Sequence, residues 1–287
     1  MNYVLALVAA GLLGTGFVLQ QAVAEQAPRG HFLRARLLLD LVGHPRWLAG
    51  VATMVAGQLL SAWVIGHLVL SVAEPLLTTS LLFALVLAWP LSGQSLTRSE
   101  VAGALLLMAG VTVLSLARTV HSVSVTVGTQ ANWPVAAAAI AAIAAGFAVA
   151  GRRRSGDTRA TWTGVSAGLV FGLQDALTRQ TVRLLGLGLL PALTSWPGYA
   201  LVVVGVIGLW LMQSAFSAGP LHASLPAITA GEPVAGICLG IVVFGDQLHT
   251  SPGLIALQAA GFVALVVGVV MVARGPALAA VRSRGRR

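Results

Sequence analysis

Three acidic residues fall in or beside long apolar segments of the sequence: Glu74, Asp175 and Glu232. A charged carboxylate at the centre of a bilayer costs roughly 2.5–3.5 kcal/mol, so each such side chain should face a cavity or a partner. Glu232 lies between Gly231 and Pro233, near the middle of its segment. Because proline has no backbone N–H, it leaves a helical carbonyl without its usual donor. Glu232 is therefore a candidate site for a cation or a proton; the alternative is a permanently protonated carboxyl with a structural role.

The other two acids have simpler explanations. Glu74 precedes Pro75 at the start of a predicted helix, where it is a second candidate for binding a substrate or an ion. The alternative is a solvated acid that the dipole of the helix N-terminus stabilises. Asp175 lies four residues before Arg179, so the two side chains share one face of a helix. We expect an ion pair near a membrane surface, and a gating role for this pair is the alternative.

Uncharged polar side chains in the apolar segments are further candidates. A glutamine amide there can hydrogen-bond a bound molecule, or it can hydrogen-bond a neighbouring helix in a structural role. Trp63 is a candidate for the wall of a pocket, and His67 and His222 are candidates for proton transfer or for positions at the membrane surface. The glutamines that are candidates for binding a substrate or an ion are Gln20, Gln58, Gln213 and Gln258.

The sequence lacks the patterns of common enzymes and metal sites. It contains no lysine, so it has no phosphate-binding loop of the kind that ATP hydrolysis requires. Cys238 is the single cysteine, which excludes a disulfide within the chain. We therefore expect no enzymatic activity and no resident cofactor. A proton, another coupling cation or Mg²⁺ would enter only as a bound ion.

The composition is that of a membrane protein. Of the 287 residues, 57% are hydrophobic and only 9% are charged, and the mean hydropathy is +0.90. Soluble domains carry about 25% charged residues, which argues against a soluble enzyme. The net charge of +9 comes from arginines between apolar segments, which argues against a nucleic-acid binder. Nine segments approach the roughly 20 apolar residues that a membrane-spanning helix needs: 3–20, 47–70, 72–91, 101–117, 133–150, 161–178, 199–213, 221–244 and 253–273.

We therefore predict an all-α fold, a polytopic membrane helix bundle of about nine transmembrane helices. A single transmembrane domain covers residues 1–287, with a first half at about 1–118, a second half at about 133–273 and a basic tail at 274–287. Residues 31–42 are too short and too charged to cross, so they are expected to form an interfacial helix.

Two segments leave alternatives open. Residues 184–199 are apolar but interrupted by glycine and proline, so they either begin the seventh span or lie at the interface. The first span could instead be a signal peptide, because Ala22-Val23-Ala24 resembles a cleavage site. The absence of a basic residue in 1–3 argues for a retained helix.

The arginine positions predict the orientation. Cytoplasmic loops collect basic residues, and an external N-terminus leaves only Arg118, Arg179 and Arg183 outside. Nine crossings then place the C-terminus in the cytoplasm, with the plasma membrane as the expected location. The fourteen arginines expected on the cytoplasmic side are Arg29, Arg34, Arg36, Arg46, Arg98, Arg152, Arg153, Arg154, Arg159, Arg274, Arg282, Arg284, Arg286 and Arg287.

Two regions of the sequence are similar to each other. Each contains a helix opened by proline, a Gly-x-x-Leu turn and a glycine-spaced helix that ends in Ala-Arg. The first covers 75–118 with its turn at 93–96, and the second covers 226–274 with its turn at 245–248. With nine spans the two units enter the membrane from opposite sides. Inverted repeats are the architecture of secondary transporters, whose substrate site lies near the midplane.

Three short motifs link the second unit to a known family: Gly-Glu-Pro-Val at 231–234, Phe-Gly-Asp at 244–246 and Gly-Phe-Val at 261–263. They resemble the EamA-type repeat of the drug/metabolite transporter superfamily. Residues 16–21 and 47–50 resemble the NIPA-type magnesium-transporter branch of the same superfamily. The resemblance covers nearly the whole chain and implies ten helices in two halves of five. This sequence departs from that pattern, because a short charged segment replaces the second helix and leaves four plus five.

The resemblance and the residues together give a first hypothesis. We expect a secondary transporter that moves a small metabolite by alternating access, with Glu232, and with it Glu74, binding a coupling proton or cation. One alternative is a NIPA-type magnesium transporter or channel, since Mg²⁺ keeps most of its waters and needs only one or two carboxylates. Another is a membrane scaffold that transports nothing. The expected partners are the lipid bilayer and a small-molecule or cation substrate, and no nucleic acid.

Glycine spacing predicts close helix packing. Gly164, Gly168 and Gly172 recur every fourth residue, so they share one helix face on which another backbone can approach closely. The partner helix is expected to belong to the same chain, and a homodimer is the alternative.

Overall fold

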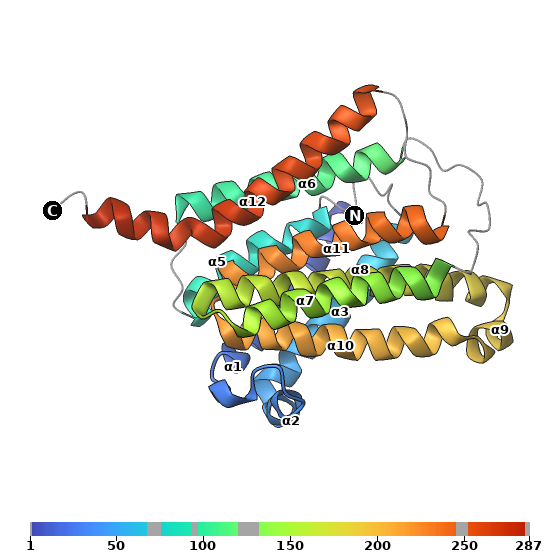
Figure 1. Cartoon of the computed structure of the whole chain (residues 1–287), viewed down its shortest axis with the longest axis horizontal. Helices are drawn as coiled ribbons and strands as arrows, with labels where there is room; N and C mark the ends of the chain where they lie inside the picture. Colours follow the sequence, from blue (N-terminus) through green and yellow to red (C-terminus); the bar gives the residue numbers. More distant parts are fainter. Residues whose placement is uncertain (1, 68–75, 93–96, 120–131, 245–251, 285–287) are drawn as a thin grey trace.

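A computed structural model describes residues 2–67, 76–92, 97–119, 132–244 and 252–284. Every regular element in these ranges is a helix, which confirms the predicted all-α fold (Figure 1). The elements are α1 (Asn2–Ala24), η1 (Arg29–His31), α2 (Arg36–Val42), α3 (Pro45–His67), α5 (Ser80–Ser92), α6 (Arg98–Thr119), α7 (Trp133–Arg152), α8 (Gly156–Leu187), α9 (Leu189–Thr194), α10 (Trp196–Ala218), α11 (Leu221–Phe244) and α12 (Pro252–Arg284).

Five helices are long and apolar enough to cross a bilayer: α1, α3, α7, α10 and α12. Each coincides with one of the predicted spans, and the chain is accordingly a membrane-embedded helical protein. The outer face of α10 shows why, because Tyr199, Val202 and Val206 are exposed there and a bilayer would cover them. The other four predicted spans fall on α5, α6, α8 and α11, which are helical. Their crossing of the membrane stays a prediction.

The glycine stripe of α8 is covered by α11 of the same chain. A Cβ on Gly164 would lie 2.7 Å from the carbonyl oxygen of Ser224, and one on Gly172 would lie 2.6 Å from Cβ of Ala235. Contacts this short show that only glycine permits the observed helix separation. The residue numbers rise together along both helices, so α8 and α11 are parallel. The stripe therefore serves packing within the chain, as expected, and is not available as a dimer face.

Helices α6 and α12 form a second close pair. A Cβ on Gly103 would lie 2.8 Å from the carbonyl oxygen of Gly268, and one on Gly110 would lie 2.7 Å from that of Gly261. The residue numbers rise along α6 as they fall along α12, so these two helices are antiparallel. Figure 1 shows the pair side by side, set apart from the layer that contains α7, α8 and α10.

Helix α11 connects these two groups of helices. The main apolar core draws on most of the helices, and it includes Leu225 of α11 and the fully buried Phe216 of α10. The Phe216 ring makes an edge contact with Phe17 of α1, with ring centroids 6.4 Å apart. A smaller cluster on the other side of α11 includes Leu114 of α6 and Leu265 of α12. Helix α11 therefore packs against the α6–α12 pair and against α8, its main partner in the other group.

Two short segments differ in detail from the prediction. The expected interfacial helix at 31–42 begins only at Arg36, because Leu33 has a positive φ of 53° that no helix continues through. Its Leu37 and Leu41 are buried, as one apolar face requires. The stretch at 184–199 is divided at Gly188, whose φ of 132° ends α8 before the short helix α9 begins.

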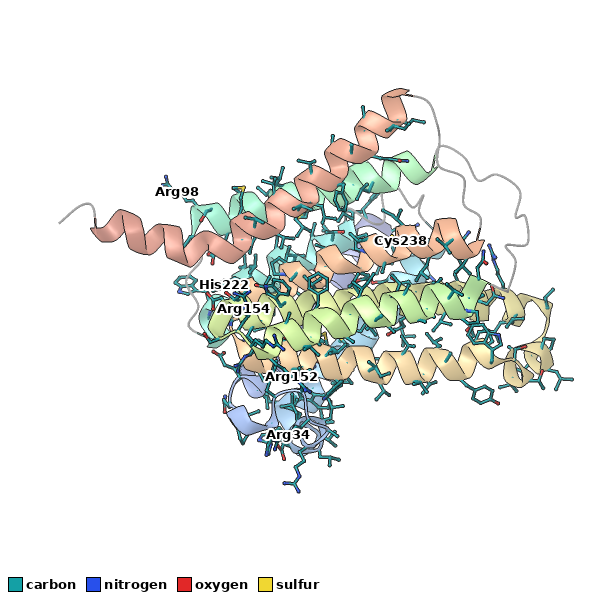
Figure 2. The ribbon with its side chains drawn as sticks, in the orientation of Figure 1. Arg34, Arg98, Arg152, Arg154, His222 and Cys238 are labelled. Atoms are coloured by element: carbon teal, nitrogen blue, oxygen red, sulfur yellow. The ribbon has the colours of Figure 1, made fainter. Side chains whose placement is uncertain are left out.

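Basic residues gather at one end of the bundle. Figure 2 shows Arg34, Arg98, Arg152 and Arg154 toward the same end, with Cys238 farther toward the other. They lie at or beside the C-terminus of α7 and the N-terminus of α6, or in the segment before α2. We call this the arginine-rich end. The four arginines at this end all belong to segments that the arginine positions predict on the cytoplasmic side of the membrane.

Candidate functional site

Glu232 is half-buried at the centre of α11, next to the proline that interrupts the helix. Because Pro233 has no N–H, the carbonyl of Thr229 receives no hydrogen bond from the position four residues later. The backbone of Glu232 lies against α8, since a Cβ on Gly168 would come within 3.1 Å of its amide nitrogen. The α8–α11 contact therefore fixes the backbone that carries this carboxyl group. A carboxyl in this position can exchange a proton or contribute one ligand to a cation.

A buried chain of hydrogen bonds joins α1, α3 and α10. The indole N–H of Trp47 donates to Oε1 of Gln213 at 3.1 Å, and Nε2 of Gln213 donates to Oε1 of Gln20 at 2.6 Å. Nε2 of Gln20 in turn donates to Sδ of Met54 at 3.5 Å. Gln20 and Gln213 are fully buried and Trp47 is 3% exposed. We call this arrangement the buried amide chain; it brings together two of the predicted site residues.

The buried amide chain lies close to the arginine-rich end. Trp47 is two residues into α3, Gln20 is four residues before the end of α1, and Gln213 is five residues before the end of α10. At 1.5 Å per residue these positions are roughly 3–8 Å from the helix ends. Each polar atom of the Gln213 amide makes one bond to a buried side chain of another helix, and Gln213 itself is fully buried. The buried amide chain is therefore better explained as a structural link between three helices than as a substrate site at the midplane of the membrane.

A second polar cluster lies where three helices begin. His222 is the second residue of α11; its Nδ1 is 3.6 Å from Oε1 of Glu100, near the start of α6. Its Nε2 is 3.9 Å from Oδ2 of Asp157, near the start of α8. Glu100 is only 1% exposed, whereas about half of the Asp157 side chain is exposed. We call these three residues the His222 cluster. Protonation of His222 would turn both approaches into ion pairs between α11 and its neighbours.

The second carboxylate oxygen of Glu100 caps the N-terminus of α6. The amide N–H of Thr97 donates to Oε2 of Glu100 at 2.5 Å, and the amide N–H of Glu100 donates to Oγ1 of Thr97 at 3.3 Å. This reciprocal pair is a capping box, which satisfies two amide groups that a helix start leaves without acceptors. Glu100 therefore stabilises α6 and faces α11 at the same time.

The remaining predicted residues lie elsewhere. Gln58 and Trp63 are on an exposed face of α3. Trp63 is also far from the buried amide chain: it lies thirteen residues, or roughly 20 Å along the helix, beyond Gly50, which contacts Gln20. Gln258 is half-buried on α12. The remaining three predicted residues are Asp175 and Arg179, which are exposed one turn apart on α8, and Glu74, which lies outside the described residues. Among the described residues, no group of three or more His, Cys, Asp or Glu side chains has a geometry that could hold a metal ion.

Sequence reasoning missed Glu100 and Trp47. Thr97 and Glu100 match the capping-box pattern, so the helix start was readable from the sequence. The approach of Glu100 to His222 was not readable, because it depends on how α6 and α11 meet. Trp47 was noticed only as part of a motif, and its bond to Gln213 likewise depends on the packing of α3 and α10.

The chain is similar over most of its length to a known protein. No protein-family model matches the chain, and no solved structure matches it. The chain is 29% identical over 251 residues to an uncharacterized protein of Corynebacterium glutamicum, which covers 85% of this chain and 84% of that protein. The similarity therefore extends over most of both proteins rather than over a single motif. Its name states no activity, so function must be inferred from the geometry of the site.

Proposed function

We propose that this chain is a secondary transporter of the drug/metabolite transporter superfamily, which moves a small metabolite across the plasma membrane by alternating access. One observation carries the proposal: α11, the helix that connects the α6–α12 pair to the other helices, bears two ionisable groups. Glu232 lies at its interrupted centre and His222 lies between two carboxylates at its start. Such groups can link the binding of a proton or cation to movement between two groups of helices.

The cost of keeping a charged Glu232 away from water would couple ion binding to the movement of the helices. An ionised carboxylate deep in the membrane is costly, so the α11 contacts would rearrange readily only when Glu232 carries a proton or a cation. Glu232 would then bind the coupling ion and the substrate would occupy the space beside it. Few fixed charges lie on the described parts of the bundle away from its ends, so a neutral, amphiphilic or singly charged metabolite fits best.

The arrangement of the helices supports an inverted repeat. α6 and α12 are the last helices of the two similar sequence units, and they pack antiparallel. Gly103 faces Gly268 and Gly110 faces Gly261, so a two-fold axis across the pair would exchange Gly103 with Gly261 and Gly110 with Gly268. Units related in this way enter a membrane from opposite sides. The arginine-rich end would face the cytoplasm and the N-terminus the outside.

A magnesium transporter of the NIPA type is a second candidate, and one contact favours it. The two segments that resemble that branch, 16–21 and 47–50, lie against each other. A Cβ on Gly16 would be 2.8 Å from the carbonyl oxygen of Gly50. The hydrated Mg²⁺ ion needs only one or two carboxylates, which Glu232 can supply in part.

The first test compares the contents of cells that produce the full chain with those of cells that do not. Mass spectrometry of small molecules and metals is applied to the wild type, Glu232→Gln and Glu25→Gln. Glu25 is an exposed acid just after α1, and a glutamine there keeps an acceptor for the side chain of Gln21, so Glu25→Gln is the matched control.

We expect a solute whose content changes with the wild type and with Glu25→Gln but not with Glu232→Gln. A change confined to magnesium would favour the second candidate. Identical contents in producing and non-producing cells would refute transport and favour a membrane scaffold.

A further inference from the structure

A pocket at the arginine-rich end is lined by three arginines and belongs to none of the sites above. It has a volume of about 400 Å³ and lies between the segment before α2 and the turn between α7 and α8. Its lining residues are Gly30, Phe32, Leu33, Arg34, Arg152 and Arg159. Figure 2 shows Arg34 and Arg152 at the same end of the molecule, on the side where α2 lies. Segments far apart in the sequence thus place three guanidinium groups around one space.

The walls of this pocket are held in place by several contacts. The Arg159 guanidinium lies over the Phe32 ring, 5.0 Å from its centroid, and its Nε donates to the carbonyl oxygen of Arg154 at 2.8 Å. The carbonyl oxygen of Arg34 accepts a bond from the indole N–H of Trp210 on α10 at 3.2 Å. These contacts use the Arg159 side chain only in part, and its Nη groups remain available for a ligand.

The backbone at Leu33 adds a second sign that the pocket is built. Leu33 has a φ of 53° although it is not glycine, and its side chain is 5% exposed. A bulky residue in this region of backbone conformation is strained and persists only where the surrounding structure imposes it. The turn it makes places Phe32 against Arg159 and presents Arg34 on the other side. The strain therefore lies within one wall of the pocket, next to Phe32, which contacts Arg159 of the other wall.

The pocket has an unbalanced positive charge. No carboxylate among the described residues forms an ion pair with Arg34, Arg152 or Arg159. The two acids nearby in the sequence have other partners, because Asp40 contacts His31 and Asp157 approaches His222. Three arginine side chains around one space attract an anion. Arginine forks match the oxygens of a phosphate group, with which they form paired hydrogen bonds.

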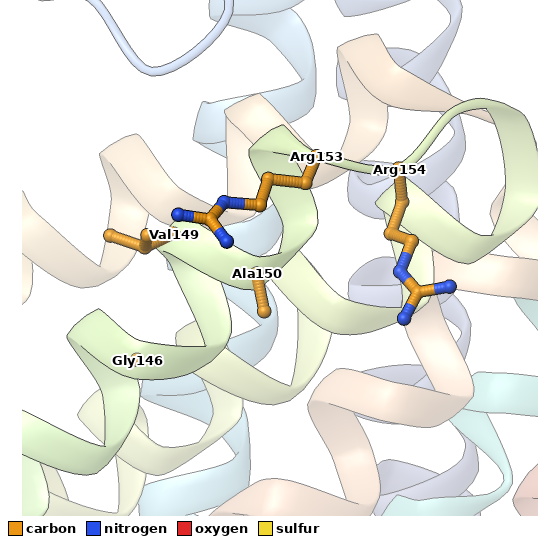
Figure 3. A pocket seen from close by; sticks show the side chains of 5 residues that line it. All are labelled: Gly146, Val149, Ala150, Arg153 and Arg154. Carbon is orange, nitrogen blue, oxygen red and sulfur yellow. The ribbon is translucent and has the colours of Figure 1, made fainter.

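A neighbouring pocket points to the kind of molecule that carries the phosphate. It is lined by Gly146, Val149 and Ala150 of α7 and by Arg153 and Arg154, with a volume of about 480 Å³. Figure 3 shows the two arginine side chains on either side of an apolar stretch of α7. This second pocket combines two arginines with an apolar face of α7, the combination that a phospholipid requires.

From these observations we infer that the pocket formed by Arg34, Arg152 and Arg159 binds a phosphate group, and that the phosphate is the headgroup of an anionic phospholipid in the adjacent leaflet. The guanidinium groups of Arg34 and Arg152 contact the phosphate oxygens, and Arg159 holds its position against Phe32 while contributing a third donor. The inference is independent of whether the chain transports anything, because it concerns only the surface between the first amphipathic segment and the α7–α8 turn.

The test measures binding to the full chain purified in a neutral detergent. Thermal unfolding is followed with added short-chain phosphatidylglycerol, short-chain phosphatidylcholine or inorganic phosphate, and native mass spectrometry counts the lipids that stay bound. The variants are Arg34→Gln and Arg152→Gln. The matched control is Arg98→Gln, which removes one exposed arginine from the same end of the molecule but outside the pocket.

We expect phosphatidylglycerol to raise the midpoint of unfolding of the wild type and of Arg98→Gln, and phosphatidylcholine to have little effect. Each pocket variant should bind phosphatidylglycerol about tenfold more weakly, the loss expected for one charged hydrogen bond. Binding of inorganic phosphate with equal dependence on Arg34 and Arg152, and with no preference for the lipid, would keep the phosphate site but overturn the lipid as its source. Equal weakening by Arg98→Gln, or no difference between the two lipids, would show diffuse charge attraction and overturn the site.

Discussion

Replacing Gly168 with alanine tests the α8–α11 contact on which the position of Glu232 depends. The new Cβ would lie 2.9 Å from Cα of Gly231 and 3.1 Å from the amide nitrogen of Glu232, and closer still to the carbonyl oxygen of Ile228. Ordinary contacts begin at 3.4 Å, so relieving the contact with Gly231 alone takes about 0.5 Å, and relieving the closer contact with Ile228 requires the helices to separate further. Overpacking of this kind costs about 1–3 kcal/mol, and the better helix propensity of alanine returns at most about 1 kcal/mol. We expect the free energy of unfolding to fall by about 1–2 kcal/mol.

The assay is reversible unfolding of the purified chain in mixed micelles, followed by circular dichroism. Gly236→Ala is the matched control: it lies one turn after Glu232 on α11, where a Cβ would meet nothing within 4 Å. This control should leave stability unchanged or raise it by up to about 1 kcal/mol. If Gly168→Ala were as stable as Gly236→Ala, the close α8–α11 contact and the fixed position of Glu232 would both be wrong.

Three further predictions concern the polar clusters. Gln213→Leu should lower the free energy of unfolding by about 1–3 kcal/mol because it leaves the amide oxygen of the buried Gln20 without its donor. The control, Gln58→Leu at an exposed position, should change the free energy of unfolding by less than about 0.5 kcal/mol. Equal effects of the two variants in the same unfolding assay would refute the buried amide chain. Glu100→Ala should lower the free energy of unfolding by about 1 kcal/mol because it removes a helix cap. Glu100→Gln should be nearly as stable as the wild type because glutamine also completes a capping box. A large loss of stability in both variants would show that the charge of Glu100 matters rather than the cap. His222→Gln should lower solute flux while leaving the fold intact, and a flux equal to that of the wild type would remove His222 from the proposed coupling.

Periodic and compositional signals in the sequence were sufficient for the helices and for some of their contacts. The apolar segments predicted α1, α3, α7, α10 and α12 as long apolar helices, because composition and length determine that property directly. The four-residue spacing of Gly164, Gly168 and Gly172 predicted a close helix contact, and the structure places α11 there. Both signals are local, since each depends on one segment of the chain.

Contacts between distant segments could not be predicted in the same way. Gln20 and Gln213 were separate candidates, but their hydrogen bond depends on the relative rotation of α1 and α10, which no local pattern specifies. The sequence also gave no reason to join Glu100 to His222, because the two residues begin different helices. The prediction at 31–42 failed at Leu33 for a related reason: a positive φ in a bulky residue is imposed by surrounding contacts and not by its own preference.

The central claim is that this chain itself moves a solute across a membrane and that Glu232 takes part. The most direct measurement is uptake of the solute identified in cells by liposomes that contain only the purified full chain. The account predicts uptake by the wild type and by Glu25→Gln, and none above protein-free liposomes by a folded Glu232→Gln. Uptake by Glu232→Gln equal to that of the wild type, or no uptake by any of the three, would contradict it.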